Sequence, residues 1–277
     1  DLPWYELNRL NLASRPAVDT LAAVWAGRVH GFDGLFIDCL TVAHWPDAGN
    51  GLRTLDFARA GIRDAAAYDS AQAVNVARLA HALREHFGPD FILCANLTGP
   101  DSLQGLFDGR MFEGMPDHFG QGFGSALAEY RRSRPWTWLK WETGWDGPYT
   151  PQACADARMA LATACMSEGY ACVGPDRDLY AGGSPFMGWW YDEMGADLGA
   201  PLGPAREVSA GAWQRDFSGG TVLLNAGTVA ATFAVSGHRL RGFRDPAVND
   251  GRAESVVRLA PMTALFVLAT PRERITP

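Results

Sequence analysis

Five short, largely apolar segments, each followed closely by a polar or acidic residue, constrain this chain most. The segments are residues 34–37, 91–95, 109–112, 137–141 and 170–174. A continuous apolar run bounded by turn residues predicts a strand that is buried on both faces. The residues that follow the segments are Asp38, Asn96, Glu113, Glu142 and Asp176. Because functional groups gather at the carboxyl ends of parallel strands, this recurrence predicts one shared crevice.

Helical patterns separate several of these segments. Helices are predicted over residues 17–30, 70–86, 125–132 and 150–167, with a short helical link at 101–106. Helix alternating with buried strand implies parallel strands joined by right-handed crossovers, in either an open doubly wound sheet or a (β/α) barrel. The barrel is favoured because polar residues end several different strands. The Gly-rich residues 120–124 also fit neither the dinucleotide fingerprint nor the P-loop.

Beyond Glu207 the pattern changes to short alternating strands. They are predicted at residues 221–225, 231–235, 239–243, 253–259 and 263–268. This spacing is typical of a small antiparallel sheet or sandwich. Residues 180–203 are rich in Gly, Pro and aromatic side chains, which indicates a boundary. We therefore expect a barrel portion over residues 1–203 and a C-terminal β-sandwich domain over residues 204–277.

The amino-acid composition restricts the kinds of molecule that this chain is expected to bind. The net charge of −7 disfavours nucleic acid and anionic membranes. No apolar run approaches the ~20 residues that span a bilayer, and no signal peptide is recognisable. The six His are scattered without metal-ligand spacing, which disfavours a zinc site. No metal and no organic cofactor are expected. The five Cys show no CxxC spacing and are predicted to be buried free thiols, which favours a reducing compartment.

Three motifs, in this order along the chain, resemble glycoside-hydrolase-like TIM barrels with a C-terminal β-sandwich. They are GLFID at residues 34–38, DGRMFEG at 108–114 and WQRDFSGGTVLLN at 213–225. The resemblance covers about residues 15–270 and implies that the five predicted strands are the fourth to eighth of the barrel. The expected fold class is therefore α/β, a (β/α) TIM-type barrel that lacks its first strands, followed by a small antiparallel β-sandwich.

Glycoside hydrolysis needs two carboxyl groups, one to protonate the leaving oxygen and one to attack the anomeric carbon or activate water. We expect Asp38 to be the nucleophile and Glu113 the general acid/base, roles that the resembling families also imply for the fourth and sixth strands. Glu142 is the competing acid, because other barrel hydrolases use the seventh strand. An ion pair or a helix cap is the structural alternative for a strand-end carboxylate such as Asp38.

Polar and aromatic residues around these acids are candidate sugar contacts, since flat rings stack on the apolar faces of pyranoses. The candidates are Asn96, Trp141, Trp145, His44, Trp45 and Asp176. Asn96 and Asp176 are alternatively turn formers, and the two later Trp side chains are alternatively core residues. His44 and Trp45 belong to a long predicted loop, where surface exposure is the alternative.

The sequence thus predicts a glycoside hydrolase that acts on a poly- or oligosaccharide. Two alternatives stay open on the same scaffold. One is a non-catalytic carbohydrate-binding protein on a degenerate hydrolase barrel. The other is a structural subunit of a larger assembly, in which another chain completes the barrel. A polysaccharide substrate implies an extracellular or cell-surface location, whereas unpaired Cys favour a reducing compartment.

Overall fold

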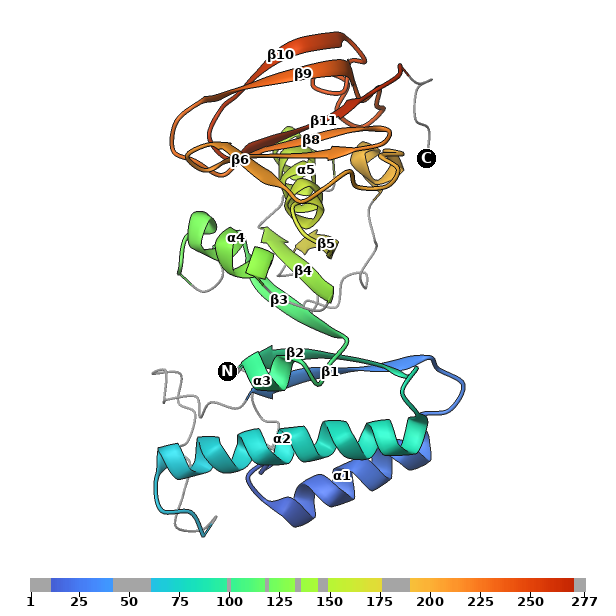
Figure 1. Cartoon of the computed structure of the whole chain (residues 1–277), viewed down its shortest axis with the longest axis vertical. Helices are drawn as coiled ribbons and strands as arrows, with labels where there is room; N and C mark the ends of the chain where they lie inside the picture. The colour runs from blue at the N-terminus through green and yellow to red at the C-terminus, as the bar shows by residue number, and fades with distance from the viewer. Residues whose placement is uncertain are drawn as a thin grey trace. The chain divides into compact units, whose positions relative to one another are not determined.

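The computed structural model describes residues 11–41, 61–98, 101–117, 120–132, 136–143, 149–175 and 190–271 (Figure 1). The chain divides into two compact units, Asp1–Met111 and Phe112–Pro277, called the first unit and the second unit below. The fold is mixed α/β, with parallel strands in both units and an antiparallel sheet in the second. The expected domain boundary between residues 203 and 204 stays a prediction.

The first unit contains two long helices and a pair of parallel strands. Its elements are α1 (Arg15–Arg28), β1 (Gly34–Thr41), α2 (Ala65–Phe87), β2 (Ile92–Thr98), the short α3 (Asp101–Gln104) and the beginning of β3 (Gly109–Met115). α2 begins where the Asp64 side chain accepts a 2.9 Å hydrogen bond from the Ala67 N–H. It ends at Gly88, whose φ of 92° lies in the region that favours glycine. Local sequence therefore determines both ends of this helix.

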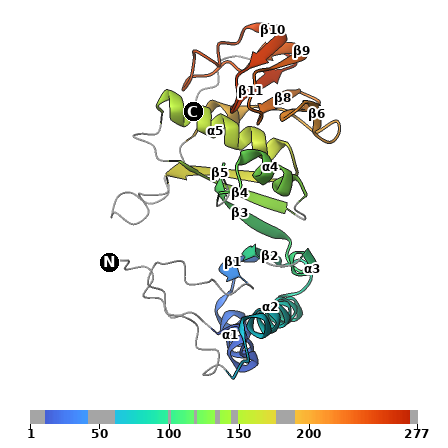
Figure 2. The same ribbon diagram turned by 90° about the vertical axis from the view of Figure 1, so that its left-hand side faces the viewer.

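α1 and α2 lie on the same side of β1 and β2 (Figures 1 and 2). The core on that side combines alternate residues of the strands with the apolar stripe of α2. It includes Val18, Ile37, Leu40, Val76, Leu79, Leu83, Leu93 and Ala95. Arg78 of α2 also donates two hydrogen bonds to Asp19 of α1. The helices are thus joined by apolar packing and by one bidentate ion pair.

In the second unit, parallel strands again alternate with helices. β3 is followed by α4 (Phe123–Arg132), β4 (Trp136–Thr143), α5 (Pro151–Cys165) and β5 (Tyr170–Pro175). β4 and β5 pair in parallel over six residue pairs, from Trp138 opposite Tyr170 onward. Hydrogen-bonded neighbours follow chain order, β1-β2-β3 and then β3-β4-β5. The described strands therefore show none of the order reversal that marks a doubly wound sheet.

The C-terminal strands form one curled antiparallel sheet. They are β6 (Arg206–Ser209), β7 (Ala212–Phe217), β8 (Gly220–Asn225), β9 (Ala231–Arg239), β10 (Ala253–Leu259) and β11 (Thr263–Leu268). The strand order is β10-β9-β11-β8-β7-β6. The expected antiparallel character is confirmed, but the described strands make a single six-stranded sheet, where a sandwich would have two.

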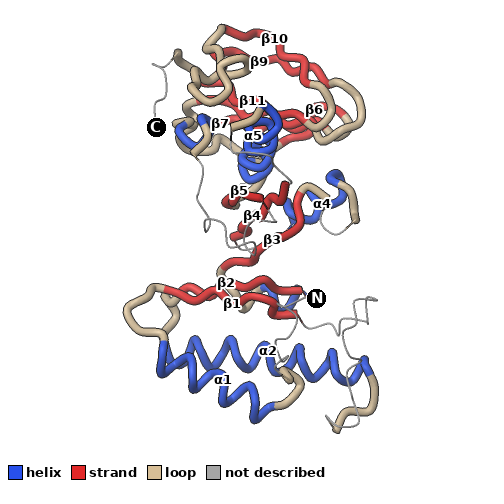
Figure 3. The backbone as a smooth tube through the Cα atoms, turned by 180° about the vertical axis from the view of Figure 1, so that it is seen from behind, coloured by secondary structure: helices blue, strands red, loops and turns tan. Residues whose placement is uncertain are grey.

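The central strands of this sheet are buried on both faces. One face carries Leu223 and Leu265 in a core enclosed by the curl of the sheet. The other face carries Val222, Leu224 and Phe266, which pack in the same core as α5. Figure 3 shows α5 between this sheet and the strands β4 and β5. Burial on both sides explains why β8 and β11 are runs of apolar residues in the sequence.

One predicted strand, residues 239–243, is wrong. β9 continues to Arg239, and beyond it only Arg241 forms an isolated bridge, with Asp250. The chain bends at Gly242 around the side chain of Asp192, so close that an added Cβ would lie 2.0 Å from Asp192 Oδ2. The close approach of Asp192 therefore requires a glycine at position 242, three residues beyond the end of β9. The described helices, in turn, include none with the length and apolarity of a membrane span.

Candidate active site

β1 and β2 fall out of register in their middle. The strands pair one to one up to Ile37, opposite Ala95, and pairing resumes at Leu40, opposite Leu97. Residues 38 and 39 therefore stand opposite a single residue of β2, which makes a β-bulge. Bulges are uncommon in parallel pairs and are over-represented beside active sites, where they re-aim a side chain. The register shift therefore makes the segment around Asp38 and Asn96 a candidate functional site of the first unit.

The bulge brings two of the predicted site residues together. Asn96 Nδ2 donates a 3.1 Å hydrogen bond to Asp38 Oδ1. Asp38 is exposed and Asn96 is half-buried. Ile37 and Leu40, on either side of the bulge in β1, are both buried in the core beneath the helices. Asp38 and Asn96 therefore occupy the opposite face of the strands, away from α1 and α2.

The expectation that these residues end their strands is wrong in detail. β1 continues three residues past Asp38, to Thr41, and β2 continues two residues past Asn96, to Thr98. Glu113 is likewise followed by two more residues of β3. The apolar runs stop earlier than the strands because pairing requires only backbone hydrogen bonds, which polar side chains do not prevent.

Glu113 lies on β3 in the second unit. Its neighbour Phe112 is fully buried, with its ring 6.1 Å from that of Tyr130 on α4 in an edge-to-face arrangement. Since side chains alternate along a strand, half-buried Glu113 faces away from α4. Glu113 thus lies on the strand face opposite α4, as Asp38 and Asn96 lie on the strand face opposite α1 and α2. In each unit, the candidate polar groups lie on the face away from the helices.

The other candidates fall largely outside the described residues. Trp141 and Glu142 lie in β4, where they pair with Val173 and Gly174 of β5, but their side chains are outside the described part of the structure. The remaining candidates outside it are His44, Trp45, Trp145 and Asp176. Their roles stay predictions.

The second unit also contains buried acids that sequence reasoning had not assigned. Asp192 and Glu193, in the 3₁₀ helix η2 (Asp192–Gly195), are 1% and 5% exposed. Arg158 of α5 donates 2.6 Å hydrogen bonds to Glu193 and to Asp245. Asn249 donates to Asp192 and to Glu193. These buried carboxylates accept hydrogen bonds from donors of the same unit, which indicates a structural role.

Thiol and metal chemistry receive no support from the described residues. Burial raises the pKa of Cys154 to about 11 and that of Cys165 to about 12, so neither thiol ionises at neutral pH. No group of three or more His, Cys, Asp or Glu side chains in the described ranges has the geometry to hold a metal ion.

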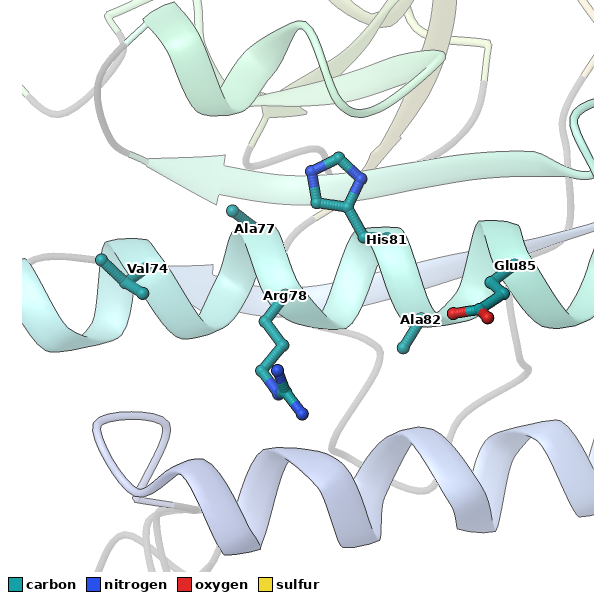
Figure 4. Close-up of a pocket in the computed structure, with 6 residues that line it drawn as sticks. All are labelled: Val74, Ala77, Arg78, His81, Ala82 and Glu85. Atoms are coloured by element: carbon teal, nitrogen blue, oxygen red, sulfur yellow. The ribbon is translucent and has the colours of Figure 1, made fainter.

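A shallow cavity of about 400 Å³ lies on the outer surface of α2 (Figure 4). It is lined by Val74, Ala77, Arg78, His81, Ala82 and Glu85. Figure 4 shows Arg78 reaching toward α1, where it pairs with Asp19, whereas His81 points to the other side of α2. The cavity therefore belongs to the helical side of the first unit, and Asp38 and Asn96 lie on the opposite side of the strands.

Comparison with known proteins gives only distant similarity. No family model matches the chain, and a search of the curated proteins finds no match. Among solved structures, the chain is similar to endo-glycoceramidase II from Rhodococcus sp., a glycoside hydrolase, in complex with a cellobiose-like imidazole (14% identity, TM-score 0.34). It is also similar to that enzyme in complex with a five-membered iminocyclitol (15% identity, TM-score 0.35).

Both matches cover 94% of this chain and 64% of the other, so the chain spans less than two thirds of the length of these structures. TM-scores at this level do not establish a shared fold. The glycoside hydrolase assignment and the barrel therefore depend on the residues described above.

Proposed function

We propose that this chain is a glycoside hydrolase that cleaves a poly- or oligosaccharide, with Asp38 as nucleophile and Glu113 as general acid/base. The observation that carries the proposal is the bulge in the parallel pair β1-β2, which sets Asp38 beside Asn96 on the face away from the helices. The strand order from β1 to β5 supports a (β/α) barrel. In such barrels the helices cover the outside, and active sites form at the carboxyl ends of the strands.

The proposed reaction has two steps. A carboxylate oxygen of Asp38 attacks the anomeric carbon and forms an ester bond. The glycosidic bond breaks, its electron pair goes to the leaving oxygen, and Glu113 gives that oxygen a proton. In the second step the ionised Glu113 takes a proton from water, the resulting hydroxide attacks the anomeric carbon, and the ester electrons return to Asp38. The configuration of the anomeric carbon is retained.

The remaining candidates keep their proposed roles. Glu142 is the alternative acid, and Trp141, Trp145, His44, Trp45 and Asp176 are proposed sugar contacts. The described residues contribute five parallel strands, whereas a TIM barrel has eight. We propose that a further segment or another chain supplies the others, that the C-terminal sheet is an accessory domain, and that the enzyme acts on substrates outside the cell.

The test is hydrolysis of a panel of aryl α- and β-glycosides and of polysaccharides, followed by fluorescence and by reducing ends. Asp38→Asn and Glu113→Gln should each lower kcat/KM by about 10²–10⁴-fold, because each removes a group that acts on the reacting bond. The exposed Asp33→Asn, just before β1, is the matched control and should keep full activity. Glu142→Gln should also remain active.

Three outcomes would contradict the proposal. Activity lost in Glu142→Gln but retained in Glu113→Gln would move the acid to β4. A wild-type chain that binds oligosaccharides in calorimetry but hydrolyses none would establish the non-catalytic binding alternative. Proton NMR of the first-formed product tests retention, and an inverted anomer would exclude Asp38 as nucleophile.

A further inference from the structure

We infer that Asn96 is a positioning residue, which holds the Asp38 carboxylate through the β-bulge, in place of the sugar contact that its strand position first suggested. The inference rests on the proposed function, since it assigns Asn96 a role in the reaction of Asp38. It is carried by the register of β1 and β2, by the burial pattern around the bulge and by one hydrogen bond between Asn96 and Asp38.

The bulge has an identifiable cause in the core. In a regular strand, side chains at positions 37 and 40 would point to opposite faces. Ile37 and Leu40 are nevertheless 6% and 3% exposed and belong to the same core beneath α1 and α2. The extra residue in β1 is what allows both to be buried on that side. Burial of Leu40 therefore maintains the bulge, and the bulge fixes where Asp38 leaves the strand.

The partner strand supplies the second constraint. β2 remains regular next to the bulge, with Leu93 and Ala95 buried in the helical core and Asn96 on the other face. Two residues of β1 face Asn96 alone, so its amide is within reach of Asp38, at 3.1 Å. Asn96 thus lies on the regular strand β2 and donates its hydrogen bond to Asp38, which projects from the bulged strand β1.

The hydrogen bond orients the Asp38 side chain through one of its oxygens. Asn96 presents its N–H to Asp38 Oδ1. A carboxyl group offers an acceptor oxygen in either protonation state, so the bond orients Asp38 without selecting between the two catalytic roles. The roles of Asp38 and Glu113 are those of the proposed function.

The test separates a group that acts through Asp38 from one that binds sugar. Asn96→Ala should lower kcat by roughly 10–100-fold and leave KM within about twofold, because it lets the nucleophile leave its attack geometry. Asn96→Asp should lose more, since it faces Asp38 with a second carboxylate. The matched control is Asn75→Ala, which removes a 2.9 Å hydrogen bond to the Leu12 carbonyl on the helical side of the same unit and should leave kcat unchanged.

Azide rescue gives the decisive comparison. In Asp38→Ala with an aryl glycoside, azide attacks the anomeric carbon in place of the carboxylate, and the product is a glycosyl azide. Adding Asn96→Ala to this background should change the rescued rate by less than about twofold, because Asn96 no longer has a nucleophile to hold. A further 10-fold loss of the rescued rate in the double variant would overturn the positioning role. A raised KM with unchanged kcat in Asn96→Ala would overturn it as well.

The failure of this inference differs from the failure of the proposed function. If the wild type hydrolyses glycosides and Asp38→Ala does not, additive losses with Asn96→Ala refute only the positioning role. If the wild type hydrolyses nothing in the panel, both fail. The ¹⁵N resonance of the Asn96 side-chain amide adds a readout that needs no activity. It should move when Asp38 is changed to Ala, and an unmoved resonance would refute the hydrogen bond.

Discussion

The carboxylate of Asp192 shows how completely one side chain can organise a loop. It accepts hydrogen bonds from the backbone N–H groups of three successive residues, 243–245, and from the Asn249 amide. Only 1% of Asp192 is exposed, so water contributes almost nothing to holding this charge. Successive backbone N–H groups form an anion-binding concavity. Here the concavity is occupied by a residue of the same chain, about fifty positions earlier.

We predict that Asp192→Ala lowers the free energy of unfolding by about 3–5 kcal/mol, because it leaves several buried N–H groups without an acceptor. Urea unfolding of the full chain, followed by circular dichroism, measures the loss. The exposed Asp90→Ala is the control and should change stability by less than about 0.5 kcal/mol. Added formate should restore part of the lost stability of Asp192→Ala and should have no such effect on the wild type or on Asp90→Ala. Equal stability of the variant and the wild type would contradict the assigned role.

At the scale of elements, the β9–β10 pair is joined by a charged side chain as well as by its backbone. Glu254 of β10 accepts a 2.6 Å hydrogen bond from Arg239 of β9 and a 2.8 Å bond from Arg252. Burial by itself would raise the pKa of Glu254, but the hydrogen bonds from the two arginines outweigh it and hold the pKa below its usual 4.5. The charged form is therefore the one that stabilises the folded hairpin.

We predict a pH-dependent stability difference between the wild type and Glu254→Gln. A carboxyl group whose pKa is lowered by folding stabilises the protein above its unfolded pKa and ceases to do so as pH falls through the folded value. The wild type should therefore exceed the variant by about 0.5–1 kcal/mol at pH 7, a modest value because Arg252 is exposed to solvent. The difference should shrink as the pH falls below about 4.5. Thermal unfolding across pH 3–7 checks this, and a pH-independent difference would exclude the mechanism.

At the scale of the whole molecule, α5 is the helix that connects the parallel strands and the antiparallel sheet of the second unit. One side of the helix packs on β4 and β5, and the other packs on β8 and β11 of the antiparallel sheet. Arg158 adds a buried polar connection from α5 to η2 and to the loop after β9, through Glu193 and Asp245. The parallel strands, the helix and the antiparallel sheet therefore share one interior, and we expect them to unfold together.

We predict that Arg158→Met lowers the free energy of unfolding by about 3–5 kcal/mol, because two buried carboxylates lose their counter-charge. The triple variant that also carries Glu193→Gln and Asp245→Asn should recover most of this loss, since no unpaired buried charge remains. Urea unfolding followed by tryptophan fluorescence compares the two. A triple variant no more stable than Arg158→Met would show that packing of the Arg158 side chain, and not its charge, is what matters.

Much of the fold was predictable from local sequence. The apolar run of β8 marks a strand buried on both faces, which needs apolar side chains at nearly every position. The run of β1 also marks a strand, but its predicted burial on both faces is wrong, because Phe36 on the face away from the helices is 38% exposed. The start of α5 at Thr150 was predicted, because capping depends on neighbouring residues only. The start of α2 was not: the helix predicted from residue 70 begins at Ala65, after the Asp64 cap. β6 and β7 were not predicted, since their mixed polar sequence pairs through the backbone and shows no strong alternation.

The candidate site was predictable in its residues but not in its geometry. The sequence places Asp38 and Asn96 after neighbouring apolar runs, which suffices to expect them on adjacent parallel strands. Their hydrogen bond depends on a bulge that no local rule predicts, because its cause is the burial of Leu40 beneath two helices.

The sequence by itself therefore determined where most helices and the apolar strands lie and which residue types follow them, because hydrophobic periodicity and capping act over a few residues. Only the tertiary structure decided what those residues contact. Asn96 reaches Asp38 across 58 positions, and Asp192 reaches the loop after β9 across more than 50. Contacts at such separations arise only when elements pack, so the sequence alone does not show that Asp192 is enclosed by the loop after β9 while Asp38 lies exposed beside Asn96.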